Sequence, residues 1–221
     1  MSDVERTEAK SRALRRYEGS PLVAGCDSGE PRLDLYSPFG PLIGKARMTP
    51  EFIDGLNRHA DGKVRADKGS EFTLPPETVF DGGEKSLMKV TEDLIQRYIC
   101  QVDGHRPRRV TIEIFWVVSQ YAGTPSPVHF HSGDISGVLY LKTPRIDRED
   151  DEERKTYISN RQAGYINFLI GGRQEFSRSL VSFKPIVGDF YIFPGWLLHG
   201  AEPFRGSGER RSLAFNARVE R

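Results

Sequence analysis

The pattern of hydrophobic and polar positions divides the chain into a helical part followed by a strand-rich part. Thr49-Pro50-Glu51 is typical of a helix start, with a capping hydroxyl, a proline at the first helical position and an acid in the first turn. Apolar side chains follow at helical spacing until Gly62. A second helix is predicted over about residues 84–100, where apolar residues recur with a period of 3.6. Before both helices, residues 33–43 read as a short strand interrupted by two prolines.

Beyond Gly104 the apolar residues fall in short runs rich in β-branched and aromatic side chains, which is typical of strands. Proline and glycine occupy most of the gaps between them. Helices followed by many short strands favour a mainly β fold, a barrel or jelly roll with N-terminal helices packed on one sheet. The strands are predicted at residues 110–119, 128–131, 136–142, 164–170, 180–184, 190–193 and 212–219.

The 221 residues are long enough for one substantial core, so we expect a single domain over residues 31–221. Residues 1–30 are rich in charge, glycine and serine, and we expect them to be flexible. A long acidic loop spans about residues 142–163. Its composition fits a solvated surface loop, while its length fits a lid beside a site, and both interpretations stay open.

Charge and composition narrow the classes of partner. Charged residues make up 29% of the chain and the formal net charge is +1, which gives no electrostatic reason to expect nucleic acid. No apolar run approaches the roughly 20 residues of a membrane helix, and the first residues lack an apolar signal core. Cys26 and Cys100 lie far apart and do not form a disulfide framework, which favours the reducing cytoplasm. A homodimer is compatible with these properties.

Three of the five histidines fall in the strand-rich part, in distinctive contexts. His129 and His131 are two residues apart, so in an extended segment both imidazoles face the same way while Phe130 faces the other way. His199 follows about 70 residues later, on a later strand. Taken singly, each could be a surface or core histidine. Together, on neighbouring strands of a closed β structure, they suit a catalytic metal with open coordination positions.

A strand predicted near the end of the chain places Arg210 and Ser212 on one face and Arg211 on the other. A guanidinium offers two parallel donors and a hydroxyl a third, which is a suitable set for a carboxylate. The alternative is that the arginines cover an exposed edge strand, and this fits Arg211 better than Arg210. Further candidates for lining a pocket are Trp116, Gln120, Asn167 and Trp196.

These motifs resemble a known family. The run from HFHSGDISGVLYL through GDFYIFPGWLLHGAEPF to GERRSLAFN is similar to the 2-oxoglutarate- and Fe(II)-dependent dioxygenases. Within them it looks most like a bacterial and phage group with HxH, FPxWLxH and ERxSxAFN motifs. The segment LDLYSPFGPLIGKARMTPEFIDGLNRHA also looks like that group's opening strand and helix, so the resemblance covers roughly residues 33–220.

The resemblance implies a double-stranded β-helix, a cupin-like jelly roll, with Fe(II), 2-oxoglutarate and O2 as cofactor and cosubstrates. The usual iron site has two histidines and one carboxylate. His129 and His199 match the histidines, and His131 stands where the carboxylate usually lies. We favour His131 as the third ligand because its spacing aims it with His129, with Asp134 as the alternate. Arg210, Ser212 and Tyr140 match positions that bind the distal carboxylate of 2-oxoglutarate.

The expected reaction is hydroxylation of a C–H bond with conversion of 2-oxoglutarate and O2 to succinate and CO2. It is centred on the iron, and no separate acid or base residue is assigned. The substrate, a small molecule or a peptide, is not identified by the sequence. Two alternatives stay open. One is a cupin dioxygenase with an all-histidine iron site that does not use 2-oxoglutarate, and the other is a non-catalytic jelly-roll binding module.

Overall fold

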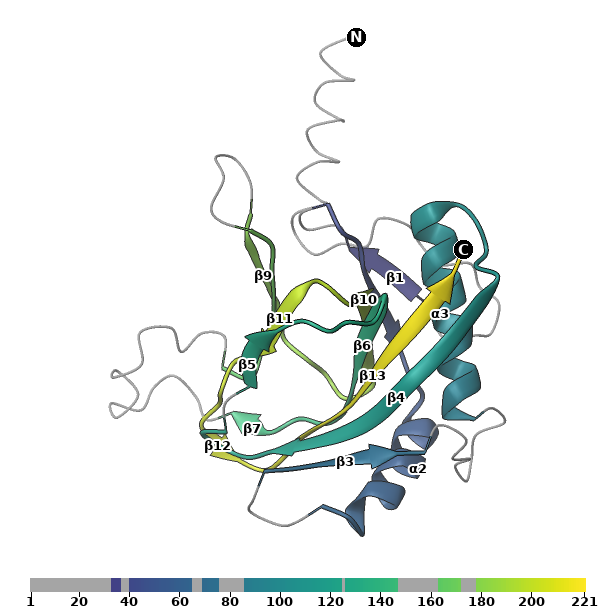
Figure 1. The fold of residues 1–221 in the computed structure, drawn as a ribbon. Coiled ribbons are helices and arrows are strands. Elements are labelled where there is room, and N and C mark those ends of the chain that lie inside the picture. The colour runs from purple at the N-terminus through teal and green to yellow at the C-terminus, as the bar shows by residue number, and fades with distance from the viewer. Residues whose placement is uncertain are drawn as a thin grey trace, which may run out of the picture.

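The computed structural model describes residues 33–36, 40–64, 69–75, 86–124, 126–146, 163–171 and 178–221 (Figure 1). The expected flexible segment at residues 1–30 lies outside these ranges, as do residues 147–162 of the acidic loop. In the part of the chain that the structure describes, no helix is both long and apolar enough to cross a membrane.

Two antiparallel sheets form the body of the molecule. The larger sheet has seven strands in the order β1-β2-β10-β6-β13-β4-β3, and the smaller has four in the order β5-β11-β8-β9. A further pair joins β7 (Arg145–Ile146) to β12 (Gly206–Ser207). The larger sheet consists of β1 (Leu33–Tyr36), β2 (Ile43–Arg47), β3 (Ser70–Leu74), β4 (Arg109–Gln120), β6 (Ile135–Lys142), β10 (Asp189–Pro194) and β13 (Arg210–Glu220). The smaller consists of β5 (Ser126–His129), β8 (Ile166–Leu169), β9 (Leu180–Phe183) and β11 (Leu198–Ala201).

The order of the strands identifies the architecture. From β4 to β13 the chain crosses repeatedly between the two sheets, with β4, β6, β10 and β13 in the larger and β5, β8, β9 and β11 in the smaller. Side chains of both sheets meet in one core, where Tyr140, Tyr191 and Phe193 of the larger sheet pack with Ile166 and Phe168 of the smaller. This is the double-stranded β-helix that the sequence predicts.

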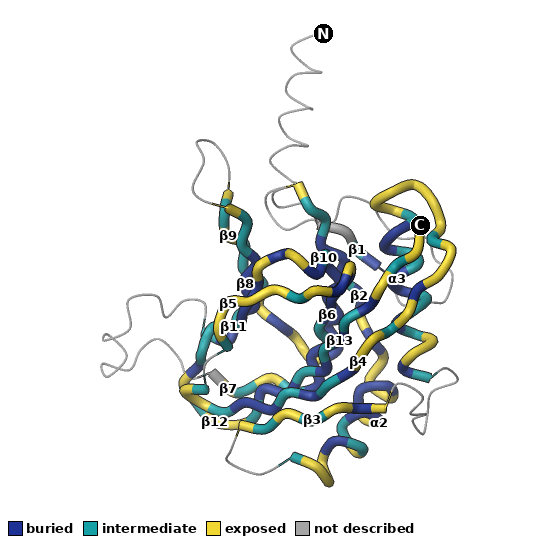
Figure 2. The backbone as a smooth tube through the Cα atoms, in the orientation of Figure 1, coloured by how far each residue is buried: buried dark blue, intermediate teal, exposed yellow. Residues whose placement is uncertain are grey.

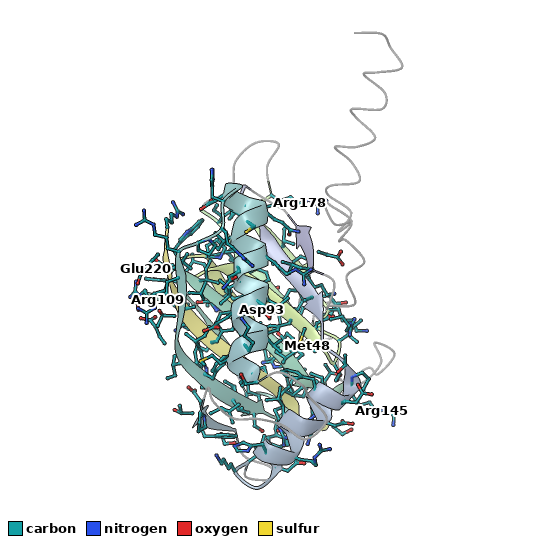
Figure 3. The ribbon with its side chains drawn as sticks, turned by 90° about the vertical axis from the view of Figure 1, so that its right-hand side faces the viewer. Met48, Asp93, Arg109, Arg145, Arg178 and Glu220 are labelled. Atoms are coloured by element: carbon teal, nitrogen blue, oxygen red, sulfur yellow. The ribbon has the colours of Figure 1, made fainter. Side chains whose placement is uncertain are left out.

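Two helices cover the outer face of the larger sheet (Figures 1 and 3). They are α2 (Pro50–Asp61), which the Thr49 hydroxyl caps by accepting from Phe52 N at 3.3 Å, and α3 (Leu87–Asp103), which ends at the left-handed Gly104. Alternation along β4 and β13 turns one set of side chains toward the helices, including Phe115 and Phe215. The opposite set faces the smaller sheet. The burial pattern in Figure 2 follows this arrangement, with the central strands largely buried.

Several sequence predictions need correction. Residues 33–43 do not form one interrupted strand, because β1 and β2 are separate and pair antiparallel, with Tyr36 opposite Ile43. The short strands β3, β7 and β12 were not predicted, and β11 was expected only as a strand carrying His199, without bounds. The helix α3 begins three residues later than expected, after the Ser86 cap. The differences in the strands arise where pairing to distant strands, rather than local pattern, decides the conformation.

The position of β13 rules out the alternative that Arg210 and Arg211 cover an exposed edge strand. This strand lies between β6 and β4 in the centre of the larger sheet, so it is not an exposed edge. Arg211 is buried on the helix side, where its guanidinium donates to Glu209 Oε1 and to Asp61 Oδ1, each at 2.7 Å. Glu209 and Asp61 therefore neutralise Arg211 within the fold and tie α2 to the sheet.

Candidate functional site

Strand pairing in the smaller sheet brings two of the three candidate histidines together. His129 at the end of β5 lies directly opposite His199 on β11, and their ring centroids are 4.5 Å apart. His131 joins them, with ring centroids 4.9 Å from His129 and 5.2 Å from His199. One ligand nitrogen from each ring lies within 4.8 Å of the others. Such a cluster matches three ligands around one metal ion.

His131 reaches the cluster by a route different from the one that we expected. The strand β5 ends at His129, so simple alternation along a strand does not place His131. Its backbone N–H instead donates to Gly195 O at 2.9 Å, and Gly195 N donates to Asp134 O at 2.9 Å. A Cβ at Gly195 would overlap Gly133 O, so only glycine allows this close approach of the two backbones. The turn after β10 therefore holds the HxH segment against β11.

Hydrogen bonds fix which nitrogen of two histidines can bind a metal. His129 Nδ1 lies 2.7 Å from Pro127 O, and His199 Nδ1 lies 2.8 Å from Leu197 O. A carbonyl oxygen only accepts, so both Nδ1 atoms carry the proton and Nε2 is the free nitrogen. Burial lowers the pKa of His199 to about 4; the hydrogen bond to Leu197 O opposes this shift, and the neighbouring histidines add to it. His199 is therefore neutral near pH 7, as a metal ligand must be.

Asp134, the alternate third ligand, is engaged elsewhere. Its side-chain Oδ2 accepts from Val219 N at 2.9 Å, and its backbone N–H donates to Ala217 O at 2.9 Å. The carboxylate is exposed and is absent from the histidine cluster among the residues that the structure describes. Phe130, between His129 and His131, is 64% exposed.

A cavity of about 270 Å³ opens between the two sheets beside the histidines. His129, His131 and His199 line it together with the other predicted site residues, Tyr140, Arg210 and Ser212. Of the further lining candidates, Trp116 and Gln120 face this cavity. Trp196 does not, and it is 56% exposed. Asn167 does not line it either, and its amide donates to Glu202 Oε1 at 2.6 Å.

Arg210 is a buried cation whose hydrogen bonds, within the described residues, all go to neutral acceptors. Its Nε and Nη2 donate to Gln120 Oε1 at 3.0 and 2.7 Å, its Nη1 donates to Glu202 O at 2.8 Å, and the guanidinium lies 5.5 Å from the Phe204 ring centroid. It is 1% exposed. Burial lowers its pKa, an effect that the nearby Tyr140 and Glu202 oppose, and the guanidinium remains charged at neutral pH. Unlike Arg211, it makes no hydrogen bond to a carboxylate within the described part of the chain, so it favours an anionic ligand in the cavity.

Tyr140 and Ser212 lie side by side near Arg210, because they are register partners on β6 and β13. Burial raises the pKa of Tyr140 to about 12, an effect that the nearby Arg210 opposes. The phenol therefore stays protonated at neutral pH and can donate a hydrogen bond. Two hydroxyls and a guanidinium thus line one cavity with the histidines. Two structural partners, the Gln120 amide and Gly195, could not be assigned these roles from sequence spacing.

Comparison with known proteins adds the chemistry to this geometry. The fold and cavity define a cupin-like protein with a candidate metal centre. Residues 114–216 match the family described as "Putative 2OG-Fe(II) oxygenase". The matched part includes all three histidines, Tyr140, Arg210 and Ser212. This segment is therefore similar to the 2OG-Fe(II) oxygenases, a class whose cofactor and cosubstrates are Fe(II), 2-oxoglutarate and O2. No curated protein matches the sequence.

Solved structures resemble this chain at low sequence identity, and the first of those that follow has a similar fold. The non-heme alpha-ketoglutarate-dependent carbocyclase SnoK from nogalamycin biosynthesis has a TM-score of 0.51 at 8% identity, over 80% of this chain and 79% of that chain. The collagen prolyl hydroxylase of Paramecium Bursaria Chlorella virus-1 has a TM-score of 0.48 at 18% identity, over 81% and 96% of the two chains. A Pseudomonas putida prolyl-4-hydroxylase has a TM-score of 0.48 at 14% identity, over 80% and 92%.

Proposed function

We propose that the enzyme hydroxylates a C–H bond of its substrate, with His129, His131 and His199 as the iron ligands. One observation carries this proposal: three histidine nitrogens converge within 4.8 Å in the same cavity that holds a buried arginine, which donates no hydrogen bond to a carboxylate in the described structure. A metal centre beside a carboxylate-binding group is the arrangement that this class of reaction requires.

The donor set fits Fe(II). Neutral imidazole is a common ligand of divalent iron, and two of the three rings are oriented by Nδ1–H hydrogen bonds to backbone carbonyls. The engagement of Asp134 with Val219 N supports His131 as the third ligand. An all-histidine site in place of two histidines and a carboxylate leaves one more positive charge at the centre, which favours dianionic 2-oxoglutarate beside it.

The remaining site residues would bind and orient 2-oxoglutarate. Arg210 offers donors to one carboxylate, and Ser212 and Tyr140 add hydroxyls on the same side of the cavity. Gln120 fixes the plane of the guanidinium, so little side-chain entropy is lost on binding. When bound, Fe(II), 2-oxoglutarate and O2 supply the oxidation, giving succinate, CO2 and a hydroxylated product. The apolar walls of the cavity, including Ile166 and Phe193, keep water from the reacting groups.

The test is anaerobic reconstitution. Fe(II) followed by 2-oxoglutarate should give a visible charge-transfer band in the parent protein. His199→Ala should abolish the band, and Arg210→Met should weaken 2-oxoglutarate binding while iron is retained. A parent protein without a band refutes the proposal. A band indifferent to Arg210→Met overturns the assignment of Arg210 and favours an iron dioxygenase that does not use 2-oxoglutarate.

The third ligand is tested separately by iron retention. His131→Ala is expected to lose iron, while Asp134→Ala retains it because that carboxylate binds only backbone in this structure. Retention by His131→Ala together with loss by Asp134→Ala would reverse the ligand assignment. Val219 N loses its partner in Asp134→Ala, so circular dichroism of both variants controls for folding.

We further propose a cytoplasmic homodimer. Leu169, Leu180 and Leu198 lie in register on the outer face of the smaller sheet, since the neighbouring Phe168 and His199 point inward. Trp196 and Phe130 are also exposed, and such an apolar surface suits self-association. Light scattering should give the mass of a dimer, and Leu180→Glu should give the monomer. A parent protein that stays monomeric at millimolar concentration contradicts this proposal.

A further inference from the structure

The cavity has a second charged residue, which the proposed chemistry does not use. Glu71 on β3 and Arg210 are the two lining residues that carry a full charge at neutral pH. Arg210 is buried, whereas Glu71 is exposed on the edge strand of the larger sheet (Figure 1). Within the described ranges, Glu71 has neither an ion pair nor a hydrogen bond from its side chain. Among the described residues, therefore, nothing neutralises this carboxylate at the rim of the cavity.

Strand register sets the position of Glu71 relative to the metal ligands. Glu71 and Thr73 of β3 lie opposite Val118 and Trp116 of β4, respectively. Glu71 and Trp116 are therefore diagonal neighbours on the face that lines the cavity. Diagonal neighbours lie about 7–8 Å apart. The Trp116 ring in turn lies 5.5 Å from the His131 ring, in an edge arrangement. A carboxylate, an indole and the metal ligands thus follow one another from the rim inward.

A carboxylate beside an indole is a recognition site for an organic cation. The carboxylate attracts the charge, and the indole face stabilises it by roughly 0.5–2 kcal/mol depending on desolvation. The opposite charge is disfavoured, because an anionic substrate would meet Glu71 at the entrance. Val118, between them on β4, offers apolar contact to a hydrocarbon linker.

We propose that the substrate carries a cationic group, an ammonium or a guanidinium, which binds between Glu71 and Trp116. This rests on the proposed function only in treating the cavity as the substrate site. The cation would then lie on the order of 10 Å from the metal ligands, from the diagonal spacing and the ring contact together. The C–H bond that reacts is therefore several bonds away from the charge, as in a basic side chain or an alkylamine.

Trp116 provides the readout. The chain has two tryptophans, and Trp196 is exposed away from the cavity, so Trp196→Phe leaves Trp116 as the single indole. This variant is loaded with Zn(II) and 2-oxoglutarate, and its fluorescence is titrated with n-butylguanidinium and with n-butylurea. The two probes share a shape and differ in charge. The guanidinium does not compete for the metal as a free amine would.

We expect n-butylguanidinium to bind about tenfold more tightly than n-butylurea, a difference of about 1.4 kcal/mol. Adding Glu71→Gln should reduce this preference to about threefold or less, because the indole contribution alone remains. The matched control is Glu220→Gln, on β13 opposite Arg109, which should leave the preference unchanged (Figure 3). Arg109 precedes Val118, the partner of Glu71, by nine residues on β4, a spacing of roughly 30 Å. Equal affinity for the two probes, or a preference indifferent to Glu71→Gln, overturns the proposal.

The outcome is independent of the proposed oxidation. Zn(II) supports no redox chemistry, so a protein that lacks the iron charge-transfer band can still pass or fail this binding test. A pentapeptide with a central arginine distinguishes the source of the cation. Tighter binding than n-butylguanidinium, abolished by Glu71→Gln, supports a peptide substrate, and weaker binding supports a small cationic molecule.

Discussion

Gly195→Ala tests the contact that positions His131. The added Cβ would overlap Gly133 O, where real Cβ atoms keep at least 3.0 Å from their neighbours. We estimate that the two backbones must separate by roughly 1 Å. The hydrogen bonds His131 N to Gly195 O and Gly195 N to Asp134 O, both 2.9 Å, then exceed the length of a hydrogen bond. The substitution therefore removes the connection between the HxH segment and the turn after β10.

The magnitude follows from those two bonds. Each contributes about 0.5–1.5 kcal/mol net, so the free energy of unfolding should fall by about 1–3 kcal/mol. For a chain of this size the Tm then drops on the order of 5 °C. His131 moves relative to His129 and His199, and displaced or poorly supported ligands cost about 10- to 100-fold in metal affinity. The effect on metal binding should therefore exceed the effect on stability.

Scanning calorimetry and anaerobic Ni(II) titration of metal-free protein measure the two effects. Gly62→Ala is the matched control, because a Cβ there meets nothing within 4 Å and its φ is −73°. This control should keep the parent's Tm and Kd. A Gly195→Ala protein with the parent's Kd for Ni(II) would refute the reasoning, since His131 would then bind metal without the turn.

Three further predictions concern buried and partly buried polar groups. Gln120→Leu removes both bonds to Arg210 Nε and Nη2, so the Kd of 2-oxoglutarate should rise about tenfold with unchanged Fe(II) affinity, and an unchanged Kd would contradict its orienting role. Tyr140→Phe should weaken 2-oxoglutarate binding about tenfold without altering iron binding. In the parent protein the Tyr98 hydroxyl donates to Leu42 O, so the control Tyr98→Phe should lower only the stability. Burial raises the pKa of Glu209, but bonds from Arg211 and Ser119 outweigh it and lower the pKa overall. The stabilisation that Glu209 contributes is present above its unfolded pKa and is lost as the pH falls through its folded pKa. Lowering the pH from 5 to 3 should therefore lower the urea midpoint less in Glu209→Gln than in the parent protein, as urea titrations at the two pH values would measure.

The local pattern of apolar and polar residues was sufficient to predict part of the fold. The Thr49 cap and Pro50 define the start of α2, and alternation along β4 and β13 separates helix-facing from cavity-facing side chains. The arrangement of two sheets with helices on one face follows from those elements. The pairing of β3 and the separation of β1 from β2 did not follow, because both depend on neighbours distant in sequence.

In the candidate site too, local pattern predicted some features, whereas contacts between distant residues determined others. The spacing of His129 and His199 anticipates two strands that meet, and the structure makes these residues direct partners. His131 joined the prediction through strand alternation, yet a backbone contact with Gly195 positions it. No pattern within one segment reveals a contact between residues 64 positions apart. The roles of the site residues stay predictions until the variants are measured.

The central place of β13 has a consequence for how the protein folds during synthesis. This strand follows every other described strand in sequence, yet it lies between β4 and β6, which both depend on it for pairing. While residues 210–220 are still inside the ribosome, the larger sheet has a gap at its centre and two unpaired edges. The histidines are synthesised before the arginine that faces them across the cavity. Folding should therefore be late and cooperative, and the nascent chain exposed to aggregation until β13 inserts.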